Sequence, residues 1–169
     1  MKKININLEE YAYYLGRLHS SLTTFEFALR GYLYAKGNPP HNSFPFDVSF
    51  THLKIGDIVP ENALTDYSTL TQLIDRYNAL MKPVYPEAIV DISIVNLRDA
   101  LAHGRIITND PTKDLVLLKF SKPIKGSDSA IVTYSQELTI EWLDQQVEHI
   151  YAEIIKIQTA PDSPFDQPI

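Results

Sequence analysis

Apolar side chains recur every three or four residues over residues 8–36, and this spacing constrains the fold more than any other feature of the sequence. The repeat comprises Leu8, Ala12, Leu15, Leu18, Leu22, Phe25, Leu29 and Leu33. Side chains at this spacing lie on one face of an α-helix, so the pattern predicts one helix long enough to cross a whole domain. Gly37 and the prolines that follow it predict where the helix ends.

Three further segments have helical periodicity. They are residues 62–82, 86–104 and 139–158. Pro86 suits the first turn of a helix, because its missing N–H has no helical partner there. Thr139 is a good N-cap for the last helix. The connection between the first two of these segments is short, so we expect them to be antiparallel neighbours.

Between the last two helical segments the period changes to that of strands. Residues 115–120 and 130–134 are short apolar or β-branched runs around a polar loop, which predicts a β-hairpin. Two strands alone are only marginally stable, so the hairpin must lie on the helices. Its basic residues are Lys113, Lys119, Lys122 and Lys125. The simpler interpretation is that these lysines keep an exposed strand edge soluble. The alternative is a positively charged surface that binds RNA.

Together the segments predict a mainly α fold, an antiparallel helical bundle of about four to five helices with an inserted β-hairpin near residues 114–135. With 169 residues, 44% of them hydrophobic, we expect one domain over residues 1–158 and a mobile, proline-rich tail over residues 159–169. No apolar run reaches the ~18 residues of a membrane span, and no apolar signal run follows Met1. The sequence therefore predicts a cytoplasmic protein that does not span a membrane.

Composition excludes several kinds of site. The chain has no cysteine, so disulfides, thiolate metal sites and cysteine nucleophiles are excluded. A net charge of −6 argues against general, nonspecific binding of nucleic acid. His41 and His52, with Asp47 between them, make a poor metal site, and the scattered glycines form no phosphate loop. We expect no metal and no cofactor.

Residues 94–104 carry the most unusual pattern, because the predicted helix is apolar on two sides. Its first side consists of Val90, Ile94, Leu97 and Leu101, and the opposite side of Ile92, Val95, Asn96, Asp99 and His103. A single surface helix has one apolar face. This helix is therefore expected either to run through the middle of the bundle or to meet a second subunit, with its charged groups at the seam.

Three ionisable side chains cluster on this helix. Asp99 and His103 are four residues apart, so their side chains can touch, and the carboxylate would orient the imidazole and favour its protonated form. Arg98 can reach the same cleft through its long stem. Gly104 is a plausible C′ residue, which would put His103 at the helix C-terminus, where the dipole also favours imidazolium. A simple interhelical ion pair and helix cap is the structural alternative.

The stretch LRDALAHG at residues 97–104 resembles the R-x4-6-H signature of the HEPN superfamily, whose common form is LRNALAHG. Asp99 stands where the family most often has asparagine. The resemblance implies a helical bundle that dimerises so that two motifs share one cleft. Here the homodimer would form through the face of Ile92, Val95, Asp99 and His103. It also implies a metal-independent endoribonuclease of the toxin or defence type.

The same resemblance assigns catalytic roles to three residues. His103 would be the acid or base, Arg98 would clamp the phosphate, and Asp99 would set the tautomer and pKa of the histidine. Such an enzyme cleaves RNA to a 2′,3′-cyclic phosphate. The partners it implies are an RNA substrate and an antitoxin-like protein.

Two other functions stay open. Some relatives of this kind are non-catalytic modules for dimerisation or partner binding, and the added negative charge of Asp99 favours that alternative. A small-ligand binder would instead use the aromatic side chains of the first helix and the loop after it.

Overall fold

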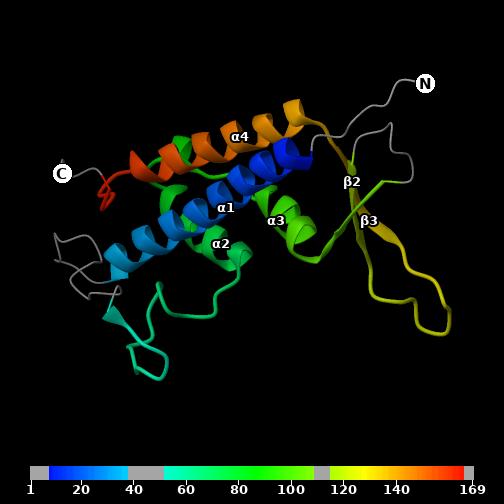
Figure 1. Ribbon diagram of the computed structural model, residues 1–169. Coiled ribbons are helices and arrows are strands. Elements are labelled where there is room, and N and C mark those ends of the chain that lie inside the picture. Colours follow the sequence, from blue (N-terminus) through cyan, green and yellow to red (C-terminus); the bar gives the residue numbers. More distant parts are fainter. Residues whose placement is uncertain (1–7, 38–51, 109–114, 166–169) are drawn as a thin grey trace. The chain divides into compact units, whose positions relative to one another are not determined.

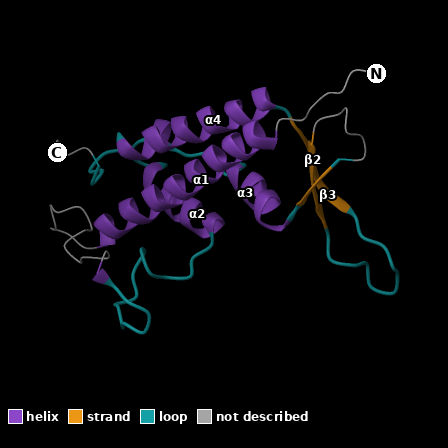
Figure 2. Ribbon diagram, in the orientation of Figure 1, coloured by secondary structure: helices purple, strands orange, loops and turns teal. Residues whose placement is uncertain are grey.

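The computed structural model describes residues 8–37, 52–108 and 115–165. The elements within this part of the chain are α1 (Leu8–Gly37), α2 (Leu70–Met81), the 3-10 helix η3 (Pro86–Ala88), α3 (Ile94–His103), β1 (Arg105–Ile107), β2 (Leu115–Phe120), β3 (Val132–Leu138) and α4 (Ile140–Gln158) (Figure 1). Helices predominate, and the strands form a small antiparallel sheet (Figure 2). The predicted mainly α fold with a β-hairpin is confirmed at this level. His41, Asp47 and Lys113 lie outside the described residues.

The chain forms two compact units. The first consists of Met1–Ser21 and Ser93–His149, and the second of Leu22–Ile92 and Ile150–Ile169. Both α1 and α4 therefore contribute their N-terminal halves to the first unit and their C-terminal halves to the second. The expected single domain over residues 1–158 stays a prediction.

The two longest helices agree with the periodicity of the sequence. Helix α1 ends one residue later than predicted, and its repeat is buried at Leu18, Leu22 and Phe25. Helix α4 begins as predicted after Thr139, whose hydroxyl accepts a hydrogen bond from the Trp142 N–H at 3.0 Å. This is the N-cap bond that satisfies an amide without a helical partner.

Helix α2 is shorter than predicted because its start lies at Leu70 instead of residue 62. Thr69 and Gln72 form a capping box, in which each side chain bonds the backbone N–H of the other residue. Such a box marks a helix start. The predicted helix over residues 62–69 is therefore wrong.

A long-range contact explains the conformation of the residues before α2. The guanidinium of Arg30 donates to the carbonyl oxygens of Ala63 and Ser68, both at 2.9 Å, and to the Asp66 carboxylate at 3.0 Å. Burial raises the pKa of Asp66, but hydrogen bonds from Ser68, Arg30 and Arg76 outweigh this effect and lower the pKa below its ordinary value. An ionised Asp66 therefore helps to hold this segment in turns.

The predicted helix over residues 86–104 is interrupted in the structure. Asn78 donates to the Val90 carbonyl oxygen and accepts from the Val90 N–H, both at 2.9 Å. Glu153, which is buried, accepts the Asp91 N–H at 2.8 Å and pairs with Lys156 at 2.6 Å. These side chains replace helical bonds over residues 89–91, so the chain is helical only in η3 and α3. The expectation of one continuous helix is wrong.

The sheet contains one strand more than predicted. Its order is β1-β2-β3, and both pairs are antiparallel. Strand β1 follows α3 after a single residue, Gly104, and is only three residues long, so its sequence pattern is too short to recognise. Strand β3 continues to Leu138, four residues beyond the predicted end. Leu117 and Leu138 are buried and mark the side of the sheet that faces the interior.

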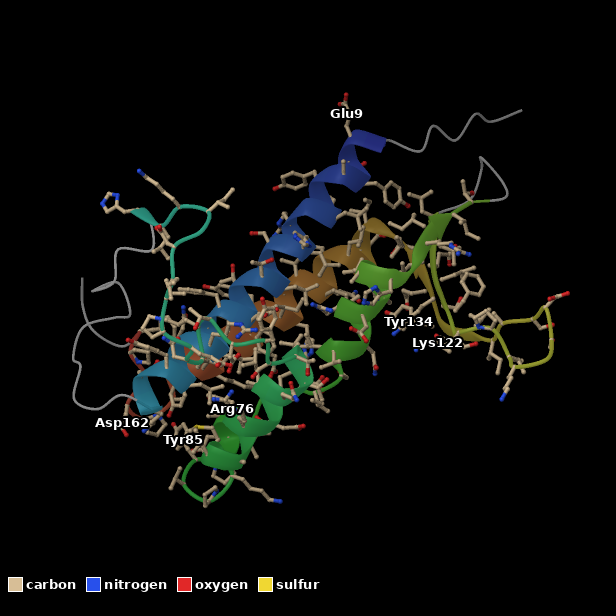
Figure 3. All side chains as sticks on the ribbon, turned by 90° about the horizontal axis from the view of Figure 1, so that it is seen from below. Glu9, Arg76, Tyr85, Lys122, Tyr134 and Asp162 are labelled. Carbon is tan, nitrogen blue, oxygen red and sulfur yellow. The ribbon has the colours of Figure 1, made fainter. Side chains whose placement is uncertain are left out.

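The start of the C-terminal tail packs on the C-terminal half of α1. The Tyr32 hydroxyl donates to the Pro161 carbonyl oxygen at 2.8 Å, and Lys36 pairs with Asp162 at 2.7 Å. Figure 3 shows Asp162 at that end of α1. Gly31 gives the Phe165 ring room, because an added Cβ would lie 2.9 Å from it. The sequence predicts a mobile tail from residue 159, but these contacts give residues 159–165 a defined position.

Candidate functional site

Helix α3 carries all three candidate catalytic residues on its outer side. Its buried residues are Ile94, Leu97 and Ala100. This confirms Ile94 and Leu97 of the first predicted stripe, whereas Leu101 is half-buried. On the opposite side His103 is exposed, and Arg98 and Asp99 are partly exposed. The helix therefore presents its charged residues toward solvent within the first unit.

Gly104 brings α3 close to the sheet. Helix α3 ends at His103, as predicted, and the Gly104 backbone after it is extended, with φ −81° and ψ −177°, instead of the left-handed conformation common at C′. The Gly104 N–H still donates to the Ala100 carbonyl oxygen at 2.7 Å. A Cβ at this position would contact that oxygen and lie 2.8 Å from the Leu118 carbonyl oxygen and 2.9 Å from Leu117. Glycine is therefore required here for close approach to β2, and not for a positive φ.

The carboxylate of Asp99 contacts two cations. Its Oδ1 lies 3.4 Å from Nη1 of Arg98, and its Oδ2 lies 3.4 Å from Nζ of Lys119. The sequence predicts Arg98 and Asp99 in the site, whereas it places Lys119 only in the hairpin. Side chains alternate between the faces of a strand, so Lys119 shares the face of buried Leu117 and is directed toward α3.

Both ion pairs are long and partly exposed to solvent. Charge-assisted hydrogen bonds are usually about 2.7–2.9 Å long, shorter than these contacts. The side chains of Arg98, Asp99 and Lys119 are 42%, 38% and 28% exposed. Pairs of this kind contribute at most about 1 kcal/mol each. An incoming anion can therefore compete with Asp99 for both cations.

The surroundings of His103 differ from those predicted. Its exposed imidazole has no hydrogen-bond partner among the described residues, and the predicted contact with Asp99 is absent there, because that carboxylate contacts Arg98 and Lys119 instead. His103 lies one helical turn after Asp99. The structure thus brings Arg98, Asp99 and Lys119 together and leaves the imidazole accessible on the next turn.

The sheet adds a neutral neighbour to the cations. Tyr134 is the cross-strand partner of Lys119, so both side chains are on the same face of the sheet. A tyrosine phenol is neutral at neutral pH, and burial raises the pKa of Tyr134 further. Figure 3 shows Tyr134 and Lys122 on the β2–β3 hairpin. Lys122 lies in the exposed loop after β2.

The opposite face of the sheet carries a different cation. The guanidinium of Arg105 lies over the Phe120 ring, 5.4 Å from its centroid. Arg105 pairs in register with Leu118, which alternates with Lys119 along β2. Arg105 is therefore on the other side of the sheet from Lys119 and does not belong to the Asp99 cluster.

The aromatic residues of α1 do not form one surface. Tyr13 is exposed, whereas Tyr11 and Tyr32 are buried. The Tyr32 ring packs edge to face on Tyr77 with 5.0 Å between centroids. These buried rings belong to the interior and not to an open ligand surface. In the described part of the chain, no group of three or more His, Asp or Glu residues is arranged to hold a metal ion.

Across the described ranges, no helix has the length and apolar character required to cross a membrane. Comparison of the chain with models of protein families, with curated proteins and with solved structures finds no match. The candidate site is therefore defined by residues 97–104 and by the contact of α3 with β2.

Proposed function

We propose that this chain is a HEPN-like, metal-independent endoribonuclease that acts as a homodimer with a shared cleft. The observation that carries the proposal is the arrangement on α3, where the accessible imidazole of His103 follows the loosely paired Arg98 by five residues. A general acid or base must reach the substrate, and a phosphate clamp must be exchangeable. The exposure of His103 and the long contact of Arg98 with Asp99 support these two roles.

The reaction would proceed by attack of the RNA 2′-hydroxyl oxygen on the adjacent phosphorus. The O2′–P bond forms and the P–O5′ bond breaks, which leaves a 2′,3′-cyclic phosphate and a 5′-hydroxyl. A base takes the 2′-OH proton, an acid gives a proton to the departing 5′-oxygen, and a cation stabilises the charge on the phosphate oxygens. His103 would serve as base or acid, and Arg98 would be the cation.

Dimerisation supplies the second proton-transfer group. One chain contributes a single His103 to the site, whereas two-fold pairing would place two imidazoles and two Arg98 side chains in one cleft. The proposed interface comprises Ile92, Val95, Asp99 and His103, and Ile92 is 46% exposed. In the finer fold that we propose, each subunit is an antiparallel bundle of four to five helices with this face outward.

The biological setting that we propose follows from the same resemblance. The enzyme would be a cytoplasmic toxin or defence nuclease, and an antitoxin-like protein would control it. The predicted influence of Asp99 on the tautomer and pKa of His103 also stays a prediction.

A non-catalytic module for dimerisation or partner binding is the second candidate. The contact of Asp99 with Arg98 and Lys119 favours it, because a carboxylate that balances these cations opposes the approach of a phosphate. In this case Arg98 and His103 would affect assembly or stability, and RNA would not be cleaved.

An RNA cleavage assay distinguishes the endoribonuclease from the non-catalytic module. Wild type, His103→Ala and His52→Ala would each be incubated with mixed single-stranded RNA in EDTA. His52 is exposed in the second unit, so its variant is a matched control for histidine removal and for purification. We expect wild type and His52→Ala to cleave equally and His103→Ala to be at least about 100-fold slower. Equal cleavage by all three proteins, or intact RNA with all three, would contradict the proposal.

A further inference from the structure

We infer that Lys119 of β2 and Arg98 of α3 bind one phosphodiester group of the RNA backbone between them, and that Asp99 holds these cations in the absence of RNA. The inference rests on the proposed ribonuclease function and adds a binding residue from a different element. It also gives Asp99 a role that does not involve His103.

The two contacts of Asp99 have the geometry that a phosphodiester needs. One carboxylate oxygen contacts Arg98 and the other contacts Lys119, each at 3.4 Å. A phosphodiester likewise carries one negative charge shared by two non-bridging oxygens. The cations are thus spaced so that one small anion with two oxygens bridges them.

Charge and solvent exposure favour replacement of the Asp99 carboxylate by a phosphodiester. Two cations face one carboxylate, and Tyr134, the cross-strand partner of Lys119, adds no negative charge because a phenol is neutral at neutral pH. The pairs are too long and too exposed to hold Asp99 strongly. Arginine presents several N–H donors in a planar fork, and lysine is a compact charge, so together they suit a phosphate better than one loosely bound carboxylate.

The fold holds Lys119 in this position. Strand β2 approaches α3 closely at Gly104, where no Cβ fits, and Leu117 is buried beside Lys119 on the same face. Lys122 is only three residues away but lies in the exposed loop of the hairpin. The fold therefore fixes the position of the Lys119 side chain, whereas Lys122 is an ordinary surface lysine.

Binding of a fluorescent 2′-O-methyl RNA oligonucleotide, which cannot be cleaved through its 2′-oxygen, tests the inference. We expect Lys119→Met to weaken binding at least about fivefold and Lys119→Arg to restore most of it. Loss of one phosphate contact should reduce the slope of log K against log salt by ~0.7. Lys122→Met is the matched control and should change affinity less than about twofold.

Asp99→Asn provides a second readout that a purely structural role would not give. Removal of the competing carboxylate leaves both cations for the phosphate, so this variant should bind the oligonucleotide more tightly than wild type. Equal effects of Lys119→Met and Lys122→Met, or weaker binding by Asp99→Asn, would overturn the inference. Unchanged circular dichroism of each variant shows that the change is not one of folding.

The outcomes separate this inference from the proposed function. If wild type cleaves RNA and Lys119→Met binds and cleaves as wild type does, the inference fails and the nuclease stands. If the binding changes occur as expected but RNA is never cleaved, the phosphate site stands and the nuclease fails. If wild type does not bind the oligonucleotide, both fail.

Discussion

Asp99 and Gly104 determine what the end of α3 can do. Asp99 is shared by Arg98 and Lys119, which keeps two cations together on a solvent-facing surface. Gly104 has an ordinary extended backbone, and because it has no side chain, β2 can approach α3 closely there. At this scale the site depends on one carboxylate and on one missing Cβ.

The prediction for Gly104 is a loss of stability on substitution by alanine. The new methyl group would meet the Leu118 carbonyl oxygen and the Leu117 side chain, and overpacking of this kind costs about 1–3 kcal/mol. Urea denaturation measures the change in the free energy of unfolding.

Gly16→Ala is the matched control because Gly16 is an exposed residue within α1 and nothing lies within 4 Å of an added Cβ. Alanine in a helix is favoured over glycine by about 0.5–1 kcal/mol, so this variant should be more stable than wild type. A Gly104→Ala protein as stable as Gly16→Ala would show that β2 does not approach α3 closely.

Among the secondary-structure elements, the long helices and strand β2 were predictable, and the starts of the shorter helices were not. The periodicity of α1 and α4 extends over many residues, so it outweighs local exceptions. The start of α2 is marked by the local capping box of Thr69 and Gln72, which helical periodicity does not reveal. The segments before α2 and α3 are held by hydrogen bonds from side chains distant in sequence. Arg30 reaches residue 68, and Glu153 reaches residue 91. Periodicity contains no information about such contacts.

In the candidate site, too, some residues are predictable from the sequence and one is not. Arg98, Asp99 and His103 are close in sequence, and their pattern on one helix identifies them. Lys119 joins them only because β2 pairs with β1 and passes α3, which is a tertiary arrangement. The sequence showed a basic hairpin, but it did not show which lysine contacts the helix.

The segment before α2 should depend on pH through Asp66. Its pKa is lower in the folded protein than in the unfolded chain, so the ionised carboxylate stabilises the fold at a pH above the unfolded value of about 3.9. This stabilisation is lost as the pH falls through the folded pKa. We expect Asp66→Asn to be less stable than wild type at neutral pH and the difference to shrink below about pH 4.

Urea denaturation of both proteins over this pH range checks the prediction. Asp57→Asn is a suitable control, because Asp57 is exposed and bonds only its own turn, at Lys54, among the described contacts. A stability difference between wild type and Asp66→Asn that does not vary with pH would contradict the account of Arg30 and Asp66.

For the molecule as a whole, the proposed function requires two copies of the chain, since one copy has one His103. Ile92 is 46% exposed, more than a core residue, and belongs to the proposed interface. An exposed apolar side chain tolerates a charge in a monomer, whereas a buried interface does not.

We therefore expect wild type to have the mass of a dimer in light scattering. The dimer of Ile92→Glu should have a dissociation constant at least about tenfold higher than that of wild type. Ile58→Glu is the control, because Ile58 is 98% exposed and lies outside the proposed interface. RNA cleavage should be lost together with dimerisation in Ile92→Glu. A wild type that is monomeric at every concentration would exclude the shared cleft.

The ends of the RNA products test the central claim most directly. Wild type would be incubated in EDTA with a defined RNA oligonucleotide and with its 2′-O-methyl counterpart, and the fragments would be analysed by mass spectrometry. The account predicts cleavage of the RNA alone, with 2′,3′-cyclic phosphate and 5′-hydroxyl ends. Intact RNA with a folded, dimeric protein, or fragments with 3′-hydroxyl and 5′-phosphate ends, would contradict it.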